Sequence, residues 1–237
     1  MVLSSPTFPR TYFQVPTVAV HMCDQRKQYD QCVSYVPLSV LEHYAPHICH
    51  LIEPDILLNR YRLFIRLPLH DHVEDIEWAG LYRLLAHWNH AAANMIDTPL
   101  PPTNSVSDAI KIYRSLQLML KPEAETLRSR IMHTLHTTPL TELDVQTIWW
   151  AFQAKPEWPS WLDALCYNLV RFQVLSGQPC GTAIQLFIET EMLNMDNAQY
   201  CQVLVAYERH GLATRSRVRT TVSRCVERSF CRFQARS

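Results

Sequence analysis

The sequence predicts an α+β fold that is mostly helical, with a small sheet and its helices followed by an α-helical extension. Three observations predict it. Short β-branched runs are confined to the first third of the chain, apolar residues at helical spacing dominate from residue 74 onward, and no internal repeat of solenoid length occurs. Strands that come first and helices that follow favour a small β element surrounded by helices.

The composition allows a real core. The chain has 237 residues, of which 48% are hydrophobic, so wholesale disorder is not expected. The formal net charge is zero, but seven arginines and one glutamate from Gly211 onward give the tail +6 and leave −6 for residues 1–210. Nucleic-acid binding is therefore not expected of the body, and any such binding would depend on the tail.

The cysteines and the N-terminus predict an intracellular protein, cytoplasmic or nuclear, without a membrane partner. The eight cysteines include no C-x-x-C pair, and the N-terminus has no positive segment before an apolar core. No apolar run approaches the roughly 20 residues that a membrane helix needs. We therefore expect free, mostly buried thiols in a reducing compartment.

The first third of the chain predicts three strands. Residues 1–15 contain prolines and serines and are expected to be disordered. Residues 17–22 are β-branched and predict a strand, and residues 32–36 predict a second strand after a polar turn. A third strand is predicted over residues 61–67, where apolar and polar side chains alternate and Pro68 follows.

Two helical regions flank this third strand. An apolar stripe over residues 38–52 predicts a helix that Pro46 breaks or restarts. Residues 74–88 are the clearest helix of the first half, because their large apolar side chains share one face and Glu77 lies off that face. Residues 89–104 contain three prolines and are predicted to be a linker.

The chain is organised around residues 105–136, which predict two helices hinged at Pro122. Apolar residues recur at three- and four-residue steps on both. Ser105 with Asp108 is typical of a capping box, and Pro122 suits the first turn of the second helix. Neither helix carries chemistry, so we interpret the pair as part of a packing surface for other proteins.

Helices are predicted for the rest of the body, starting at residues 141, 160, 182 and 197. Thr141 with Asp144 forms a second capping-box pattern at the first of them. Four tryptophans crowd around two prolines here, and we expect them to fill the joint between two helices. They are Trp149, Trp150, Trp158 and Trp161. Residues 211–237 lack periodicity and are expected to be disordered.

Several of these segments together resemble the BTB/POZ domain, in the version common among fungal proteins. The segments that carry the resemblance are the hairpin at residues 17–36, the helical step at 36–46, the strand with its closing Leu-Pro at 63–68, the helix at 77–88, the paired helices at 110–135 and the start of an extension at 138–149. The resemblance implies a BTB/POZ-like domain over residues 16–137 and a helical C-terminal extension over residues 138–210, between the disordered segment 1–15 and the basic tail 211–237.

This resemblance also implies a function. It indicates a non-enzymatic protein–protein interaction module that self-associates or docks a partner, as a homodimerising scaffold or as a substrate adaptor for a cullin-based ubiquitin ligase. Apolar helix faces that meet a partner's groove would be its physical basis. Under this interpretation the chain has no catalytic residue, no cofactor, no cofactor-binding residue and no metal ligand.

Two alternatives stay open at the level of sequence. His43, His47 and His50 lie at i, i+4 and i+7, so on an unbroken helix they would share a face and could hold zinc in a small helical metal protein or enzyme. Pro46 argues against that helix, and exposed surface histidines are the simpler interpretation. The arginine tail is either a nucleic-acid arm or an extension without a role. The four glycines are too scattered to build a phosphate-binding loop.

Overall fold

The computed structural model describes residues 16–24, 29–55, 60–66, 74–153, 155–174, 181–194 and 198–211. The two segments predicted to be disordered lie outside these residues, except for Gly211. Within the described chain, a small sheet and a larger set of helices confirm the predicted α+β class with a mostly helical chain.

The sheet contains β1 (Thr17–Asp24), β2 (Tyr29–Pro37), β3 (Ile52–Asp55) and β4 (Arg60–Arg66), in the order β2-β1-β4-β3. β1 pairs antiparallel with β2 and parallel with β4, and β3 pairs antiparallel with β4. Three strands agree with the predicted ones, although β2 begins three residues early. β3 is not predicted from sequence, because its four residues include a proline and two carboxylates and only the pairing with β4 makes it a strand.

Three helical segments accompany the sheet. As predicted, Pro46 restarts the helix, so that α1 (Leu38–Tyr44) is followed by the 3-10 helix η1 (Pro46–Leu51). α2 (Glu74–Ala93) extends five residues into the predicted linker, because three consecutive alanines at its end favour helix. The prediction for Glu77 is wrong: its side chain is fully buried.

The organising pair is confirmed as α3 (Val106–Leu118) and α4 (Glu123–Thr137), with Pro122 between them. Ser105 Oγ accepts a hydrogen bond from the amide of Asp108, as predicted. The carboxylate of Asp108 pairs with Arg83 of α2 at 2.7 Å, so the predicted reciprocal capping box is only half formed.

The extension begins with α5 (Glu142–Phe152), whose predicted capping box is complete. It continues with α6 (Trp158–Asn168) and its π-helical end η2 (Leu169–Val174), then α7 (Thr182–Phe187) with the π-helical η3 (Ile188–Met192), and α8 (Tyr200–Gly211). Three of the four tryptophans are buried as expected, and Trp150 is partly buried against the same core.

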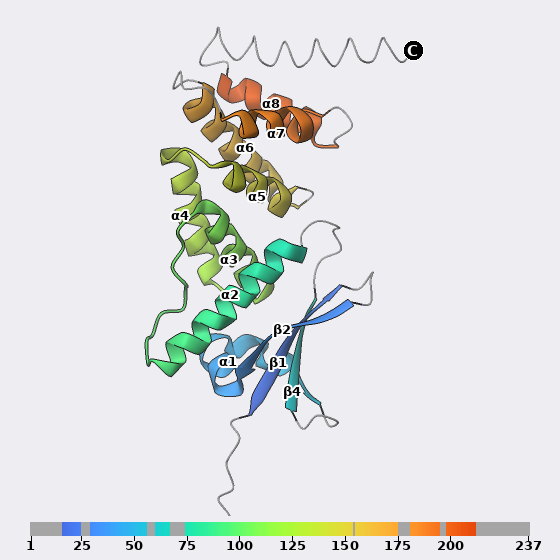
Figure 1. Cartoon of the computed structure of the whole chain (residues 1–237), viewed down its shortest axis with the longest axis vertical. Coiled ribbons are helices and arrows are strands. Elements are labelled where there is room, and N and C mark those ends of the chain that lie inside the picture. The colour runs from blue at the N-terminus through green and yellow to red at the C-terminus, as the bar shows by residue number, and fades with distance from the viewer. Residues whose placement is uncertain are drawn as a thin grey trace, which may run out of the picture.

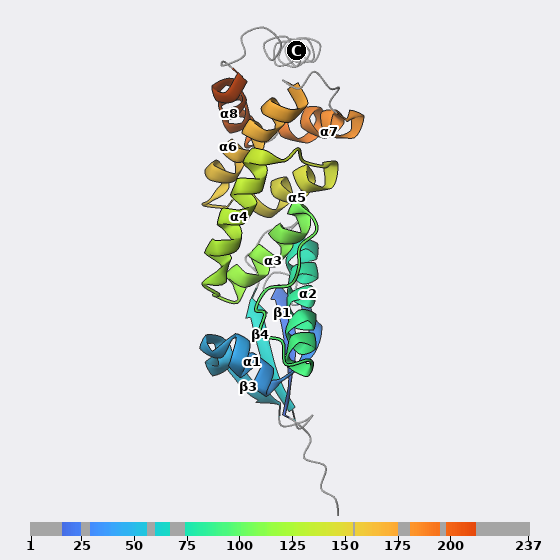
Figure 2. The same ribbon diagram turned by 90° about the vertical axis from the view of Figure 1, so that its left-hand side faces the viewer.

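These elements stack along the long axis of the molecule. The sheet with α1 and α2 forms one end, α3 and α4 lie in the middle, and α5 to α8 form the other end (Figure 1). The view turned by 90° shows α1 and α2 on the same side of the sheet (Figure 2). One cluster of buried side chains runs continuously from β1 to α8.

Asp144 joins the middle of the molecule to the extension. Its Oδ2 accepts hydrogen bonds from the amide and hydroxyl of Thr141 in the capping box of α5. Its Oδ1 accepts a hydrogen bond of 2.7 Å from the amide of Ser107, in the first turn of α3. One buried carboxylate therefore satisfies donors at the N-termini of two helices, where negative charge is favoured.

Aromatic rings fill the same junction. Phe152 stacks on Trp161 with ring centroids 3.9 Å apart, and the ring of Tyr113 lies 5.5 Å from Trp161. Burial raises the pKa of Tyr113 to about 12, with a further contribution from the nearby charge of Glu157. The extension is thus packed onto α3 and shares its core.

The structure also bears on two expectations from composition, about membrane-spanning helices and about the burial of the cysteines. In the part of the chain that the structure describes, no helix is long and apolar enough to cross a membrane. Of the five cysteines described there, only Cys166 is buried, so the expectation of mostly buried thiols is wrong for these residues. Cys201 is exposed on α8.

Candidate protein-interaction surface

The three histidines of the metal alternative do not converge. His43 Nε2 lies 3.7 Å from Asp97 Oδ1, His47 donates a hydrogen bond to the carbonyl of Met119, and His50 is exposed. A new helical segment begins between His43 and His47, so the three do not share one helix face. Within the described ranges, no group of three histidine, cysteine or acidic side chains could hold a metal ion. The geometry gives the metal alternative no support.

Tyr44, the last residue of α1, connects two turns that are far apart in sequence. Its ring stacks on Trp88 of α2 with centroids 5.4 Å apart, and its hydroxyl donates to the carbonyl of Ile96 at 3.2 Å. Its own carbonyl accepts a hydrogen bond of 2.5 Å from Lys121 Nζ. Tyr44 therefore bonds to both the turn after α2 and the turn after α3.

Both turns have the same unusual geometry. Met95 (φ 52°) and Leu120 (φ 53°) have left-handed backbones, and no other non-glycine residue in the described part of the chain has a positive φ. Each lies in a Schellman cap: Ile96 donates to the carbonyl of Ala91, and Lys121 donates to that of Leu116. Glycine usually occupies this position, because a side chain costs about 1–2 kcal/mol there.

Neither strained side chain is used for packing. The exposed fraction is 95% for Met95 and 71% for Leu120, the two largest values among the exposed large hydrophobic residues that the structure describes. The left-handed backbone closes each helix end by pairing its last carbonyls, but a glycine would do this without strain, and the exposed apolar side chain adds little to the fold. Such outliers are typical of positions that serve a function.

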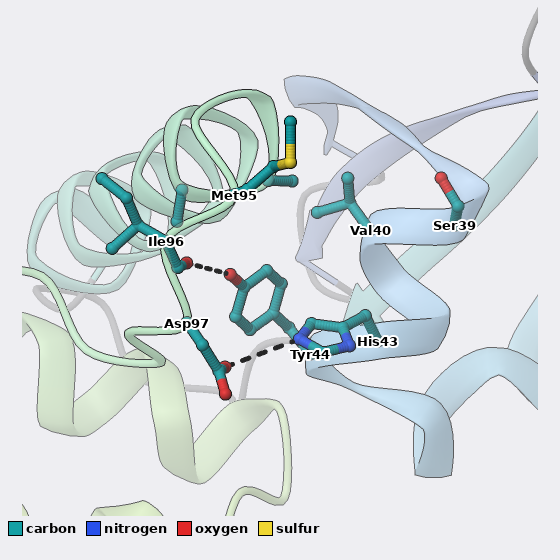
Figure 3. Close-up of a pocket in the computed structure, with 9 residues that line it drawn as sticks. Ser39, Val40, His43, Tyr44, Met95, Ile96 and Asp97 are labelled. Atoms are coloured by element: carbon teal, nitrogen blue, oxygen red, sulfur yellow. Dashed lines mark hydrogen bonds and ion pairs between the residues drawn. The ribbon is translucent and has the colours of Figure 1, made fainter.

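We use the name Tyr44 corner for His43 together with the exposed residues of the two turns that are bonded to Tyr44, which are Met95, Ile96 and Leu120. Part of it is a hollow of about 380 Å³ between α1 and the end of α2. Figure 3 shows Met95 facing Val40 across this hollow, with Tyr44 between α1 and the chain at Ile96. Rigid walls and exposed apolar side chains are the features of a protein-contact surface.

The hollow also brings together a serine, a histidine and a carboxylate, which sequence reasoning did not connect. Ser39, His43 and Asp97 all line it. Acyl transfer by such a set requires a hydrogen bond from the serine to the imidazole and a buried carboxylate behind it. In the described structure Ser39 makes no hydrogen bond to His43, and the side chain of Asp97 is 90% exposed. The three side chains therefore lack the hydrogen-bonded geometry that acyl transfer needs.

The Tyr44 corner was missed at the level of sequence because its parts fall in the predicted linker and hinge. A signal was present: two helices end without a glycine, and each end is followed by a pair of apolar residues. The pairs are Met95-Ile96 and Met119-Leu120. Only the tertiary contacts of Tyr44 bring them to one place.

Comparison of the chain with protein-family models, with curated proteins and with solved structures found no match.

Proposed function

We propose that this protein is a non-enzymatic protein-interaction module that self-associates through the Tyr44 corner. The observation that carries the proposal is the pair of exposed, left-handed residues Met95 and Leu120, held in place by one tyrosine. Glycine would close the same two helix ends without strain, and the fold does not bury either side chain, so a contact with another protein surface is the simplest reason for two large apolar residues there.

The order of the elements supports a BTB/POZ-like organisation as part of this proposal. A hairpin is followed by α1 and η1, then by the short β3 and by β4, which is parallel to β1, then by α2 and the pair α3 and α4. This is the order in which the sequence resembles that family. The resemblance adds a cullin scaffold as a candidate partner and an intracellular compartment as the place of action.

Sedimentation velocity of the full chain over a series of concentrations tests the proposal. We expect dimers at micromolar concentration, and we expect Met95→Asp and Leu120→Asp to shift the chain to monomers, because a charge at a buried contact must be desolvated. Leu143→Asp is the matched control: Leu143 is 56% exposed on α5, at the far end of the molecule. Thermal unfolding of each variant checks that the fold is intact.

The outcomes separate self-association from other roles. Wild type that stays monomeric at all concentrations would remove self-association. In that case affinity purification from the native cell extract compares wild type with Leu120→Asp and Leu143→Asp. A cullin that is recovered with wild type and Leu143→Asp but lost with Leu120→Asp would make the chain a ligase adaptor; equal recovery with all three would exclude the Tyr44 corner as the docking surface.

A further inference from the structure

β4 is longer than the strand that covers its outer edge. β1 pairs with β4 as far as Arg66, but β3 pairs only with the first four residues, ending at Leu63 opposite Ile52. Among the described residues, no strand pairs with Phe64, Ile65 and Arg66 on the side away from β1. Backbone donors and acceptors on such an edge are free to pair with another chain.

A groove lies at this end of the sheet and includes the unpaired residues of β4, with Glu53 of β3 and Cys23 of β1 also lining it. Its volume is about 840 Å³, and its wall opposite β4 is formed by Ile48 and Leu51 of η1 and by Leu118 and Met119 at the end of α3. Leu51 is 47% exposed, and Leu118 is partly buried. The groove therefore offers an apolar wall next to an open backbone edge, which is the combination that strand addition uses.

Opposite charges bound the groove. Arg66 is exposed at one end and has no ion pair with a described residue. Glu53 is exposed at the other end, and its cross-strand neighbour Arg62 is already held by Asp55 at 2.7 Å. An occupant that runs antiparallel to β4 would pair from Arg66 to Phe64 and would leave the edge at Ile52, which already pairs with Leu63. An acidic residue near its start would match Arg66, and a basic residue after the paired segment would match Glu53.

Strand geometry also determines which way the side chains of the occupant point between these two charges. Neighbouring strands lie about 4.8 Å apart and successive side chains point to opposite faces. Ile65 is buried on the face of the sheet that meets α3 and η1. A side chain paired with Ile65 would thus point to the apolar wall, and its two neighbours would lie beside Phe64 and Arg66.

We propose that the outer edge of β4 at Phe64–Arg66 binds an extended peptide segment of a partner protein, which continues the line of β3 and carries an acidic residue beside Arg66 followed by a large apolar residue. This goes beyond the proposed self-association, since it uses the edge of β4, which is not part of the Tyr44 corner, and recognises backbone as well as side chains. Three residues of the peptide pair with the open edge, because Ile52 of β3 already occupies the position opposite Leu63.

The probe is a labelled hexapeptide, Ser-Glu-Ile-Tyr-Val-Lys, titrated with the full chain. We expect saturable binding in the micromolar range by fluorescence anisotropy, and slower amide hydrogen exchange at residues 64–66 in the complex. Two further peptides, N-methylated at alternate residues, test strand pairing: one should lose binding and the other should keep it, because only alternate amides face β4. Absence of binding at 1 mM peptide, or an equal effect of the two methylated peptides, would overturn the proposal.

Variants test the register. Arg66→Glu should weaken binding about fivefold, and a peptide with lysine in place of its glutamate should restore it. Leu51→Asp should also weaken binding, because it places a charge in the apolar wall that the peptide would contact. Thermal unfolding first checks that both variants are folded. Met95→Asp should leave peptide binding unchanged, while Arg66→Glu should leave sedimentation unchanged, so each proposal can fail without the other. Arg66→Glu that binds both peptides like wild type would contradict the charge pairing.

Discussion

Arg114 donates two hydrogen bonds to a single oxygen of Glu77, from Nε at 3.2 Å and from Nη2 at 2.9 Å. Both side chains are buried, and the pair joins α2 to α3. Nη1 of Arg114 also donates to Gln117 and to Glu157 in the segment before α6, so the network extends to the extension. The other carboxylate oxygen of Glu77 is buried and has no hydrogen-bond partner among the residues that the structure describes.

Removing one partner of the Glu77–Arg114 pair should destabilise the fold. We expect Glu77→Ala to lower the free energy of unfolding by about 3–5 kcal/mol, because it leaves a buried guanidinium without its main partner. Replacing both Glu77 and Arg114 by methionine should cost less than the sum of the single changes, as measured by urea unfolding in a double-mutant cycle. Arg128→Ala is the control: it removes a surface pair with Glu125 that is worth less than about 1 kcal/mol. Additive single effects at Glu77 and Arg114 would contradict their coupling.

The same glutamate should give stability a pH dependence. Burial raises the pKa of Glu77 above its ordinary 4.5, although the charge of Arg114 opposes this shift. The folded chain then binds this proton more tightly than the unfolded chain, so the contribution of Glu77 is fully present below pH 4.5 and is lost as the pH rises through the raised pKa. We expect the stability of wild type relative to Glu77→Gln to fall between pH 4.5 and neutrality in urea unfolding. A relative stability that grows with pH over this range would show a lowered pKa instead.

Gly80 allows α2 to approach α3 more closely than a side chain would permit. A Cβ atom there would lie 2.1 Å from the carbonyl oxygen of Lys111 and 2.5 Å from Ser115 Oγ. We expect Gly80→Ala to cost about 3 kcal/mol or more in thermal or urea unfolding, since backbone must move. Gly181→Ala meets nothing within 4 Å, so it should change stability by less than about 1 kcal/mol. Equal effects of the two changes would contradict the observed packing.

These contacts also explain how far the sequence could predict the structure. Periodicity and caps predicted the helices, because those signals are local: Pro46 restarts a helix, and Thr141 with Asp144 forms the expected box. Glu77 was assigned to the wrong face, because only Arg114, 37 residues further on, makes its burial tolerable. β3 was missed for the same reason, since its partner strand lies outside the segment itself.

The candidate site was harder to predict than the fold. The histidine spacing suggested convergence that the break at Pro46 prevents. The Tyr44 corner depends on a left-handed backbone at Met95 and Leu120, which nothing in their residue type favours. It also depends on contacts from Tyr44 that span 52 and 77 residues of sequence.

Strain and function can be separated at the two left-handed residues. We expect Met95→Gly and Leu120→Gly each to raise the free energy of unfolding by up to about 1 kcal/mol, because glycine relieves the strain and little buried surface is lost. Both changes should weaken self-association in sedimentation velocity. Met95→Ala is the matched control, since it removes most of the side chain but keeps the strain: it should weaken association without any gain in stability. Glycine variants that are less stable than wild type would contradict the strain, and glycine variants that still dimerise as wild type does would contradict the role of these side chains in contact.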